Sequence, residues 1–444
     1  MIKEFVHQFC QAAKAAGIEK LNFYMEERSN RDISVYDETL EYLERSEMSQ
    51  LFIEGLVDSK CGCVFVENFD AALIPDYIQT IRETAEVSVS SFEPYDLEGL
   101  KQTDADWHAC TDLDETVKTM CDASRAARAV DSRISEGVQV HVGESGRRFT
   151  LANEQEQFAS DVIVGGRAGL YLVARDGDLV QPGGRGKPFA KELPDMTELA
   201  TAAAEGAVSC LGAVSHATGS FPVVLDARVV AELLDAFMPA FFARNVQSRM
   251  SVLAGRIGEQ IGGENISILE DPAMEGGFRN RSFDDEGVPT VAKAIVDKGI
   301  LKCWLHNRAT ARKDECVSGG NGFKGRYNES VTTGYTNIYI PKGELTRDQL
   351  MEQMGSGLLI TSVSGVFAGA RPNSGDFSLI STGFRVEEGK IHHAVNQITI
   401  AGNFFEMLKN VQAIGCDEHW MTAVSGNVKV PSLYVSSLAI SGKE

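Results

Sequence analysis

The hydrophobic positions in the first hundred residues follow two different periods. Residues 1–17 carry apolar side chains at the spacing of an amphipathic helix, and Gly17 ends that pattern. Alternating apolar and polar residues then predict strands at 21–25, 33–35, 51–53 and 63–65, with turns near Ser29–Asn30 and Asp58–Ser59. A helix over residues 76–86 is expected to follow this antiparallel meander.

The same order of helices and strands then begins again. Asp112 is followed three residues later by Glu115, which resembles a capping box and predicts a helix start. Alternation returns between residues 134 and 180, and an Ala-rich helix is expected over 196–217. The Gly- and Pro-rich stretch 181–188 between them is typical of a turn or surface loop. The order suggests two similar units, about 1–105 and 106–220, although no residues match at a fixed period.

The second half of the chain has a different pattern. A short apolar strand over 221–225 precedes Asp226, which is expected to cap a helix reaching about residue 245. Pro239 should kink or end that helix. Short strands and turns follow to the end, and 444 residues exceed what one core usually serves. The sequence therefore predicts an α+β chain: an N-terminal α+β domain with antiparallel sheets and helices over 1–220, and a strand-rich C-terminal domain over 221–444.

The composition narrows the possible partners and the compartment. With 42 Lys and Arg against 63 Asp and Glu, the net charge is −21, which repels phosphate backbones and argues against a nucleic-acid partner. The longest uncharged runs, 206–225 and 353–370, contain several polar residues, so no membrane span is expected. The start has no apolar signal region, and nine scattered cysteines are typical of reduced thiols. We expect a soluble, cytoplasmic protein.

Residue spacing alone reveals no catalytic constellation. Two C-x-x-H pairs, Cys303 with His306 and Cys416 with His419, could in principle form a zinc site or a hydrolase centre. The gap of 416 − 303 = 113 residues is unlike the paired spacing of structural zinc sites, and Cys303 reads as a small core residue. No nucleophile elbow or phosphate-binding loop is present, because the Gly-rich run 183–186 precedes Pro188.

Several ordered motifs in the second half resemble the TldD/PmbA family, also called modulators of DNA gyrase. They are Gly277-Phe-Arg-Asn-Arg-Ser-Phe-Asp-Asp-Glu-Gly-Val-Pro-Thr290, Asn373-Ser-Gly-Asp-Phe-Ser-Leu379, Gly383-Phe-Arg-Val-Glu-Glu-Gly-Lys390, Asn396-Gln-Ile-Thr-Ile-Ala-Gly-Asn403 and Val430-Pro-Ser-Leu-Tyr-Val-Ser-Ser-Leu-Ala-Ile-Ser-Gly442. The resemblance implies a pair of related bacterial subunits that act as a cytoplasmic zinc peptidase on unfolded or modified peptides. It also implies a C-terminal domain of the TldD/PmbA type.

In the TldD-like catalytic subunit, the resemblance implies an H-E-x-x-x-H motif and a Cys near the C-terminus. Two imidazoles and a thiolate would hold zinc, and the Glu would serve as general base. The matching stretch here places Asp235 and Ala240 at the histidine positions and Ala236 at the glutamate position. Ser425 falls near the expected Cys, and no His occurs between His216 and His306. This chain is therefore expected to bind no zinc and no other cofactor itself.

The missing motif makes the chain resemble the second, TldE/PmbA-type subunit. That subunit would pair through its C-terminal domain with a TldD-like, zinc-bearing chain and hold peptide. The candidate peptide-binding residues cluster in the first motif: Arg279, Arg281, Asp284, Asp285, Glu286 and Gly287. Its acids would bind a cationic peptide end or polarise the subunit boundary; the alternative is a solvated hairpin turn. A homodimeric peptide- or protein-binding module without peptidase activity remains the alternative function.

Overall fold

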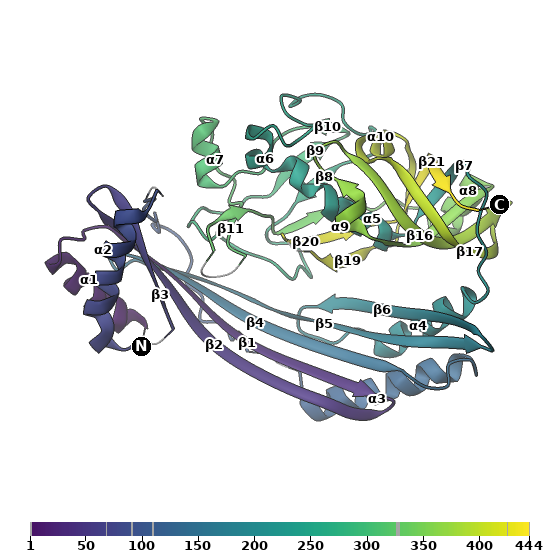
Figure 1. Cartoon of the computed structure of the whole chain (residues 1–444), viewed down its shortest axis with the longest axis horizontal. Helices are drawn as coiled ribbons and strands as arrows, with labels where there is room; N and C mark the ends of the chain where they lie inside the picture. Colours follow the sequence, from purple (N-terminus) through teal and green to yellow (C-terminus); the bar gives the residue numbers. More distant parts are fainter. Residues whose placement is uncertain are drawn as a thin grey trace.

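We describe a computed structural model of the chain, covering residues 2–67, 69–89, 92–108, 111–325, 329–423 and 425–443. Its N-terminal half is a six-stranded antiparallel sheet with helices on one face (Figure 1). The elements in chain order are α1 (Ile2–Ala15), β1 (Leu21–Tyr36), β2 (Thr39–Val57), β3 (Lys60–Val66), η1 (Ala71–Leu73), α2 (Ile74–Val87), α3 (Leu113–Val130), β4 (Gln139–Asn153), β5 (Phe158–Asp176), β6 (Leu179–Phe189) and α4 (Met196–Ser209).

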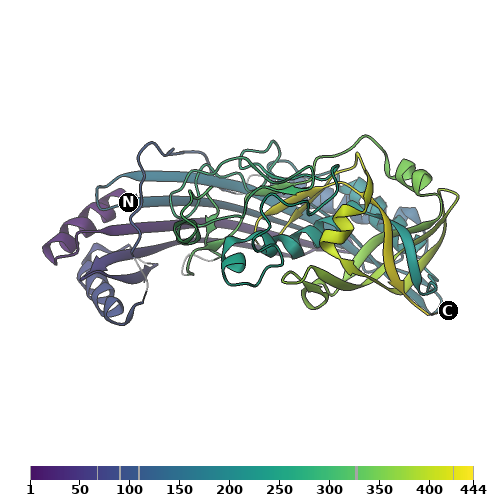
Figure 2. The same ribbon diagram turned by 90° about the horizontal axis from the view of Figure 1, so that it is seen from above.

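The strand order β3-β2-β1-β4-β5-β6 puts the first strand of each meander, β1 and β4, at the centre of the sheet. The sequence α-β-β-β-α occurs twice along the chain, yet the strands form one continuous sheet. The join is the antiparallel pairing of β1 with β4, which runs from Asn22 opposite Asn153 to Tyr36 opposite Gln139. Seen from above, the long strands extend along most of the molecule (Figure 2).

One face of this sheet is covered by two pairs of helices at opposite ends. Phe23 on β1 belongs to the core under α1 and α2, whereas Val35 on the same strand belongs to the core under α3 and α4. The two residues are an even number of positions apart, so they point to the same face. The opposite face presents Tyr24 and Phe149, which form a buried cluster with Phe283 from the C-terminal half.

The C-terminal half contains a closed ring of strands and a second sheet. The ring runs β14-β7-β21-β17-β16 and closes through pairing of β16 with β14. Its strands are β7 (Gly219–Leu225), β14 (Gly357–Ser364), β16 (Asp376–Glu387), β17 (Lys390–Asn403) and β21 (Leu433–Ser441), with β15 (Ala370–Arg371) and β18 (Val411–Ile414) attached.

The second sheet has the order β10-β9-β8-β13-β20-β19. Its strands are β8 (Ile268–Glu270), β9 (Lys293–Asp297), β10 (Ile300–Leu301), β13 (Asn337–Tyr339), β19 (His419–Thr422) and β20 (Asn427–Val430), and β11 (Gly322–Phe323) pairs separately with β12 (Thr332–Thr333). The remaining elements are α5 (Ala227–Phe237), η2 (Met238–Phe241), α6 (Ala243–Gln247), α7 (Arg308–Lys313), α8 (Arg347–Met354), α9 (Val366–Gly369) and α10 (Phe404–Lys409).

Helix α5 is the central helix of the C-terminal half, because it contacts β19 and β20 of one sheet and β14 and β15 of the other. Its apolar residues, including Leu233 and Phe237, belong to the largest core cluster of the molecule. The helix ends at Phe237, and Pro239 lies in the short 3₁₀ turn that follows, as the sequence predicted. The α+β class and the strand-rich C-terminal half are likewise confirmed.

Three local predictions are wrong. Strand β1 continues straight through Ser29–Asn30, and the first hairpin turns instead at Asp37–Glu38, where both residues have positive φ. Residues 181–188 form part of β6 and not a surface loop. Helix α4 ends at Ser209, well before residue 217. None of the helices within the described residues combines the length and the hydropathy needed to cross a bilayer.

Candidate functional site

The acidic turn at residues 284–287 is buried, so the alternative of a solvated hairpin is wrong. Asp284 is 0% exposed, and its Oδ1 accepts hydrogen bonds from the backbone N–H groups of Glu286 and Val288, both at 2.9 Å. Its Oδ2 accepts from the N–H of Gly322 at 2.8 Å. Burial raises the pKa of Asp284 to about 8, and the charge of Glu286 adds to the shift. Asp284 therefore fixes the loop and has little capacity left for a peptide.

Asp285 and Arg281 form a buried ion pair within the C-terminal half, and Arg281 also contacts the large sheet. Arg281 Nη2 donates to Asp285 Oδ1 at 2.9 Å, and its guanidinium lies 4.0 Å from the ring centroid of Phe149 on β4. Burial lowers the pKa of Arg281, but the charges of Asp285 and Asp161 outweigh it, so the net shift is upward. The backbone N–H of Lys324 donates to Asp285 Oδ2 at 2.8 Å. These contacts hold the loop against the large sheet.

The other three candidate residues differ in how far their polar groups are used. Glu286 accepts a hydrogen bond from the N–H of Arg308 at 2.7 Å, and Gly287 adopts φ = 75°, which favours glycine. The guanidinium of Arg279 lies 5.2 Å from the ring centroid of Phe323 and pairs with no carboxylate among the described residues. Burial lowers the pKa of Arg279 to about 10, and the nearby charge of Arg147 lowers it further. Of the six candidates, Arg279 has the most unused donor capacity.

At the positions where the resemblance places the zinc motif, α5 and the turn after it carry one hydrogen-bonded acid and two alanines. The hydroxyl of Tyr335 donates to Asp235 Oδ1 at 2.7 Å. Burial raises the pKa of Asp235, and the Tyr335 hydrogen bond partly offsets that effect. Ala236 packs against the main core, and Ala240 in the following turn is 1% exposed. These side chains do not fit a zinc ion, since one carboxylate that already accepts a hydrogen bond is the only metal ligand among them.

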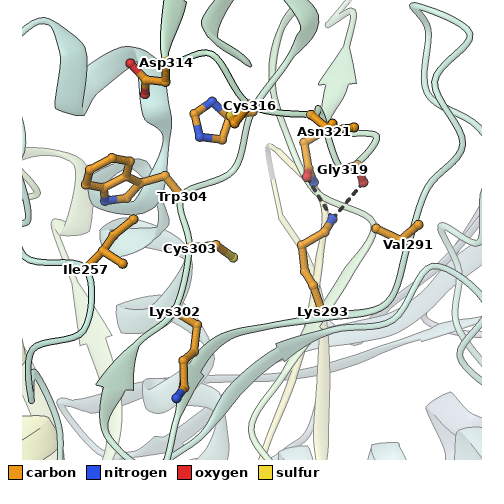
Figure 3. Close-up of a pocket in the computed structure, with 12 residues that line it drawn as sticks. Ile257, Val291, Lys293, Lys302, Cys303, Trp304, Asp314, Cys316, Gly319 and Asn321 are labelled. Atoms are coloured by element: carbon orange, nitrogen blue, oxygen red, sulfur yellow. Dashed lines mark hydrogen bonds between the residues drawn. The ribbon is translucent and has the colours of Figure 1, made fainter. Parts of the chain in front are cut away.

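The two C-x-x-H pairs do not meet in one site. Cys303 and His306 line a cavity of about 480 Å³ beside Trp304 (Figure 3). His419 lies elsewhere: burial and the neighbouring charge of Arg228 lower its pKa to about 4. Within the ranges that the structure covers, no three His, Cys, Asp or Glu side chains gather as metal ligands. The hypothesis of a hydrolase or zinc centre built from both pairs is therefore wrong.

A buried polar network beside this cavity was not found by sequence reasoning. Lys293 Nζ donates to Glu270 at 2.8 Å. It also donates to Gly319 O and Asn321 Oδ1, each at 2.9 Å (Figure 3). Glu270 also accepts from the backbone N–H of Thr336 at 2.8 Å. The only signal in the sequence was an acid directly after the apolar pair of strand β8. Every polar group named here has a partner, so the network stabilises the fold rather than offering a free ligand site.

Comparison with known proteins places this fold among metallopeptidase-type proteins. The family model for the C-terminal domain of PmbA/TldA metallopeptidases matches residues 218–442, and the model for their central domain matches residues 109–211. The chain belongs to the PmbA/TldD family.

Individual relatives agree with this membership. A metalloprotease of Methanothermobacter thermautotrophicus is 30% identical over 259 residues, which cover 56% of each chain. A PmbA homologue of Haemophilus influenzae is 29% identical over 375 residues, covering 81% of this chain and 75% of the relative. The chain thus spans only about half the length of the first of these relatives.

Two solved structures have the same fold. A protein from Thermotoga maritima described as a modulator of DNA gyrase has a TM-score of 0.88 at 27% identity, over 99% of this chain and 100% of that one. TldE from Thermococcus kodakarensis has a TM-score of 0.83 at 18% identity over the same shares of the two chains, a likeness that concerns the fold alone.

Proposed function

We propose that this chain is the non-catalytic, TldE/PmbA-type subunit of a cytoplasmic zinc peptidase that acts on unfolded or modified peptides. The proposal rests on the side chains that α5 and the turn after it present where the resemblance places the zinc motif. The Asp235 carboxylate accepts a hydrogen bond from Tyr335, Ala236 is partly buried against the core, and Ala240 is buried in it. A metal ligand set would require three side chains that this helix does not offer.

The chain's own part in such an enzyme would be to position peptide and to complete the assembly. Family membership supports a role in peptide chemistry, and Arg279 offers an unpaired guanidinium beside Phe323, a combination suited to peptide carbonyls or carboxylates. The eight described cysteines are free thiols, in keeping with a reducing compartment. The catalytic zinc would belong to a TldD-like partner chain.

A reconstitution experiment tests this proposal. The full chain is purified alone and together with a TldD-like chain that carries H-E-x-x-x-H, and cleavage of an unfolded, fluorescently labelled casein is measured. We expect no cleavage by this chain alone, a heterodimer on size-exclusion chromatography, and cleavage by the mixture. Cleavage by this chain alone, with one zinc per chain by elemental analysis, would contradict the proposal. A homodimer with no affinity for the partner would favour the binding-module alternative.

A variant at Asp235 tests whether this residue of α5 has a structural or a catalytic role. Asp235→Asn keeps an oxygen that can accept the Tyr335 hydrogen bond but cannot act as an anionic metal ligand or base. We expect the mixture to keep its cleavage rate within about twofold, since a neutral acceptor replaces a single hydrogen bond. A loss of about 100-fold or more, in a variant with unchanged melting temperature, would show that Asp235 takes part in the reaction.

A further inference from the structure

The outer side of β2 is paired with another strand over only part of its length. Its inner side pairs with β1, and the short β3 pairs with its outer side at residues 51–57. No strand among the described residues pairs with the outer side of residues 39–50. Figure 1 shows β2 running along the margin of the large sheet well beyond β3. We call residues 39–50 the open edge of β2.

The backbone of the open edge directs hydrogen-bonding groups away from the sheet. At the paired end of β2, the N–H of Leu56 donates to the carbonyl of Lys20 at 3.0 Å, on the side of β1. Successive residues of a strand direct these groups to opposite sides, and β2 pairs with β1 without a register shift from Tyr42 onward. The groups that point to the outer side, where an added strand would find them, are therefore those of residues 43, 45, 47 and 49.

The open edge also exposes apolar side chains on both faces of the sheet. Leu40, Tyr42, Leu43 and Met48 are each between 40% and 45% exposed. Tyr42 and Met48 lie on the same face as Phe52, and Leu43 lies on the opposite face, because side chains alternate along a strand. A strand laid beside the open edge would therefore contact apolar side chains on both of its faces.

The opposite margin of the large sheet is protected against such pairing. That margin is β6, which contains Pro182 and Pro188, and proline has no N–H to offer to an added strand. The open edge of β2 contains no proline, glycine or lysine. The backbone of β2 can therefore pair along the whole of its open edge.

The charge of the open edge indicates which kind of strand fits it. It carries Glu41, Glu44 and Glu47 against a single cation, Arg45. The acids of the nearby hairpin turn pair with arginines of α3, whereas Glu44 and Glu47 take part in no ion pair among the described residues. A second copy of this chain would bring the same excess of acids, and like charges on facing strands repel. Basic side chains on the added strand would be attracted instead.

We propose that the open edge of β2 binds an extended peptide segment with basic and apolar residues, which adds to the sheet as a strand in line with β3. The inference rests on the proposed function, in which this subunit holds unfolded peptide. In recognition by strand addition, main-chain hydrogen bonds supply affinity and the side chains supply specificity. An unfolded peptide offers an unpaired segment, whereas the strands of a folded protein are already paired with one another.

Fluorescence anisotropy with the full chain tests the proposal. Three labelled octapeptides with blocked ends are compared: one in which Lys and Val alternate, one in which Glu replaces each Lys, and the Lys peptide with N-methyl groups on its two central residues. Methylation of two successive residues removes a donor from each edge of the peptide strand and keeps its charge. We expect the unmodified Lys peptide to bind about tenfold or more tighter than either of the others.

Charge variants locate the effect on β2. Glu44→Lys combined with Glu47→Lys should reverse the preference, so that the Glu peptide binds tighter than the Lys peptide. The matched control is Glu264→Lys combined with Glu275→Lys, which changes two exposed acids of the C-terminal half and should leave the preference for the Lys peptide unchanged. This control is needed because a chain with a net charge of −21 attracts basic peptides in general.

A proline variant tests the role of the backbone. Glu47→Pro removes an N–H that points to the outer side and leaves the pairing with β1 in place, so it should weaken binding of the Lys peptide about tenfold. Its control, Glu47→Gln, removes the same charge but keeps the N–H, and should weaken binding less than about threefold. Melting curves identify variants that fail to fold, and the combined Lys variant at the exposed positions 44 and 47 provides the readout if Glu47→Pro is unstable.

Equal binding of the three peptides, binding of none of them, or a preference for the Lys peptide that the combined Lys variant retains would overturn this inference. Tighter binding of the Lys peptide without any effect of N-methylation would overturn it too, because charge would then act without an added strand. A dimer of the chain alone that Glu47→Pro dissociates would show that a second copy occupies the edge, which also contradicts the proposal.

The proposed function keeps its own test, the cleavage of casein by the mixture with a TldD-like chain. A mixture that cleaves casein while the chain shows none of the expected peptide preferences rejects the open edge alone. A chain whose open edge binds the Lys peptide but which never activates a partner retains this binding site and rejects the subunit role.

Discussion

His419 shows how one residue reports on its surroundings. It begins the edge strand β19, where Asp226 and the arginines at 228, 167 and 185 are its charged neighbours. Burial is the largest cause of its depressed pKa, and the arginines add to it more than Asp226 opposes it. The imidazole is therefore neutral near pH 7, and protonating it in the folded state would add a further cation to a region already rich in them.

Stability should fall as the pH drops from 7 to 5, in part because of His419. The unfolded His419 has a pKa near 6.5 and takes up a proton in this range, whereas the folded residue, with a pKa of about 4, does not. The difference in proton uptake thus lowers the free energy of unfolding by roughly 1–2 kcal/mol at pH 5 relative to pH 7. Denaturant unfolding at the two pH values measures this. His419→Gln should remove that part of the slope, and His7→Gln, at an exposed position, should not.

At the scale of elements, glycines decide how closely helices approach the large sheet. Helix α2 crosses β3 at Gly62, where a Cβ would overlap the carbonyl oxygen of Ile81. The same holds for α4 on β6: a Cβ on Gly183 would lie 2.7 Å from the Cβ of Ala207. Both contacts depend on the absence of a side chain rather than on an unusual backbone conformation, because neither glycine has a positive φ.

Gly62→Ala should therefore destabilise the N-terminal half. The added methyl group forces α2 away from the sheet, and overpacking of this kind costs about 1–3 kcal/mol. The matched control is Gly186→Ala in the same sheet, whose Cβ would meet nothing nearer than the Arg167 side chain at 3.4 Å and should stay within about 0.5 kcal/mol. Thermal unfolding monitored by circular dichroism compares the two variants. Equal melting temperatures would refute the close-packing argument.

Helix boundaries that depend on neighbouring residues were predicted correctly from the sequence. The side chain of Asp112 accepts from the N–H of Glu115 and caps α3, and Pro239 ends α5. Strand β6 was missed because glycine and proline usually mark turns. Here β6 is an edge strand, where a missing N–H is tolerated, and Gly183 is needed for the approach of α4. The edge position of β6 and the approach of α4 both depend on the tertiary structure, so the local sequence could not indicate them.

The candidate site was predicted in the same uneven way. The resemblance pointed to Asp235 in α5, but it did not reveal the hydrogen-bond partner of Asp235. That partner, Tyr335, is 100 residues away in the chain. The run of acids at 284–286 suggested exposure, since a buried charge is costly without donors. The donor that completes the shell of Asp284 is Gly322, 38 residues away, which no local pattern reveals.

At the scale of the whole molecule, a few polar contacts fasten the C-terminal half to the large sheet. Asp161 on β5 accepts from the N–H of Ser282 at 2.5 Å and from its hydroxyl at 2.9 Å, and it lies 3.9 Å from Arg281. On the surface, Arg308 donates to the carbonyl of Pro94 at 2.8 Å, and Arg312 pairs with Glu93. The buried set and the exposed set should contribute differently to stability.

Arg281→Ala should destabilise the contact between the halves strongly. It leaves the buried carboxylate of Asp285 without its cation, a change that typically costs about 3–5 kcal/mol. Arg312→Ala removes a pair between the same two halves whose arginine is 59% exposed, and should cost no more than about 1 kcal/mol. Chemical denaturation and limited proteolysis compare the variants. Similar losses in both would contradict the distinction between buried and exposed pairs.

The pairing of β1 with β4 also constrains how the chain can be made. The inner edge of β1 is covered only after β4 has been synthesised, because Tyr36 pairs with Gln139 and Asn22 pairs with Asn153. These partners are roughly 100–130 residues apart, which is on the order of 5–25 s of translation. During that interval the nascent chain exposes a 16-residue strand edge, the kind of surface that templates aggregation. The first three strands cannot complete their sheet while the ribosome is still making the second three.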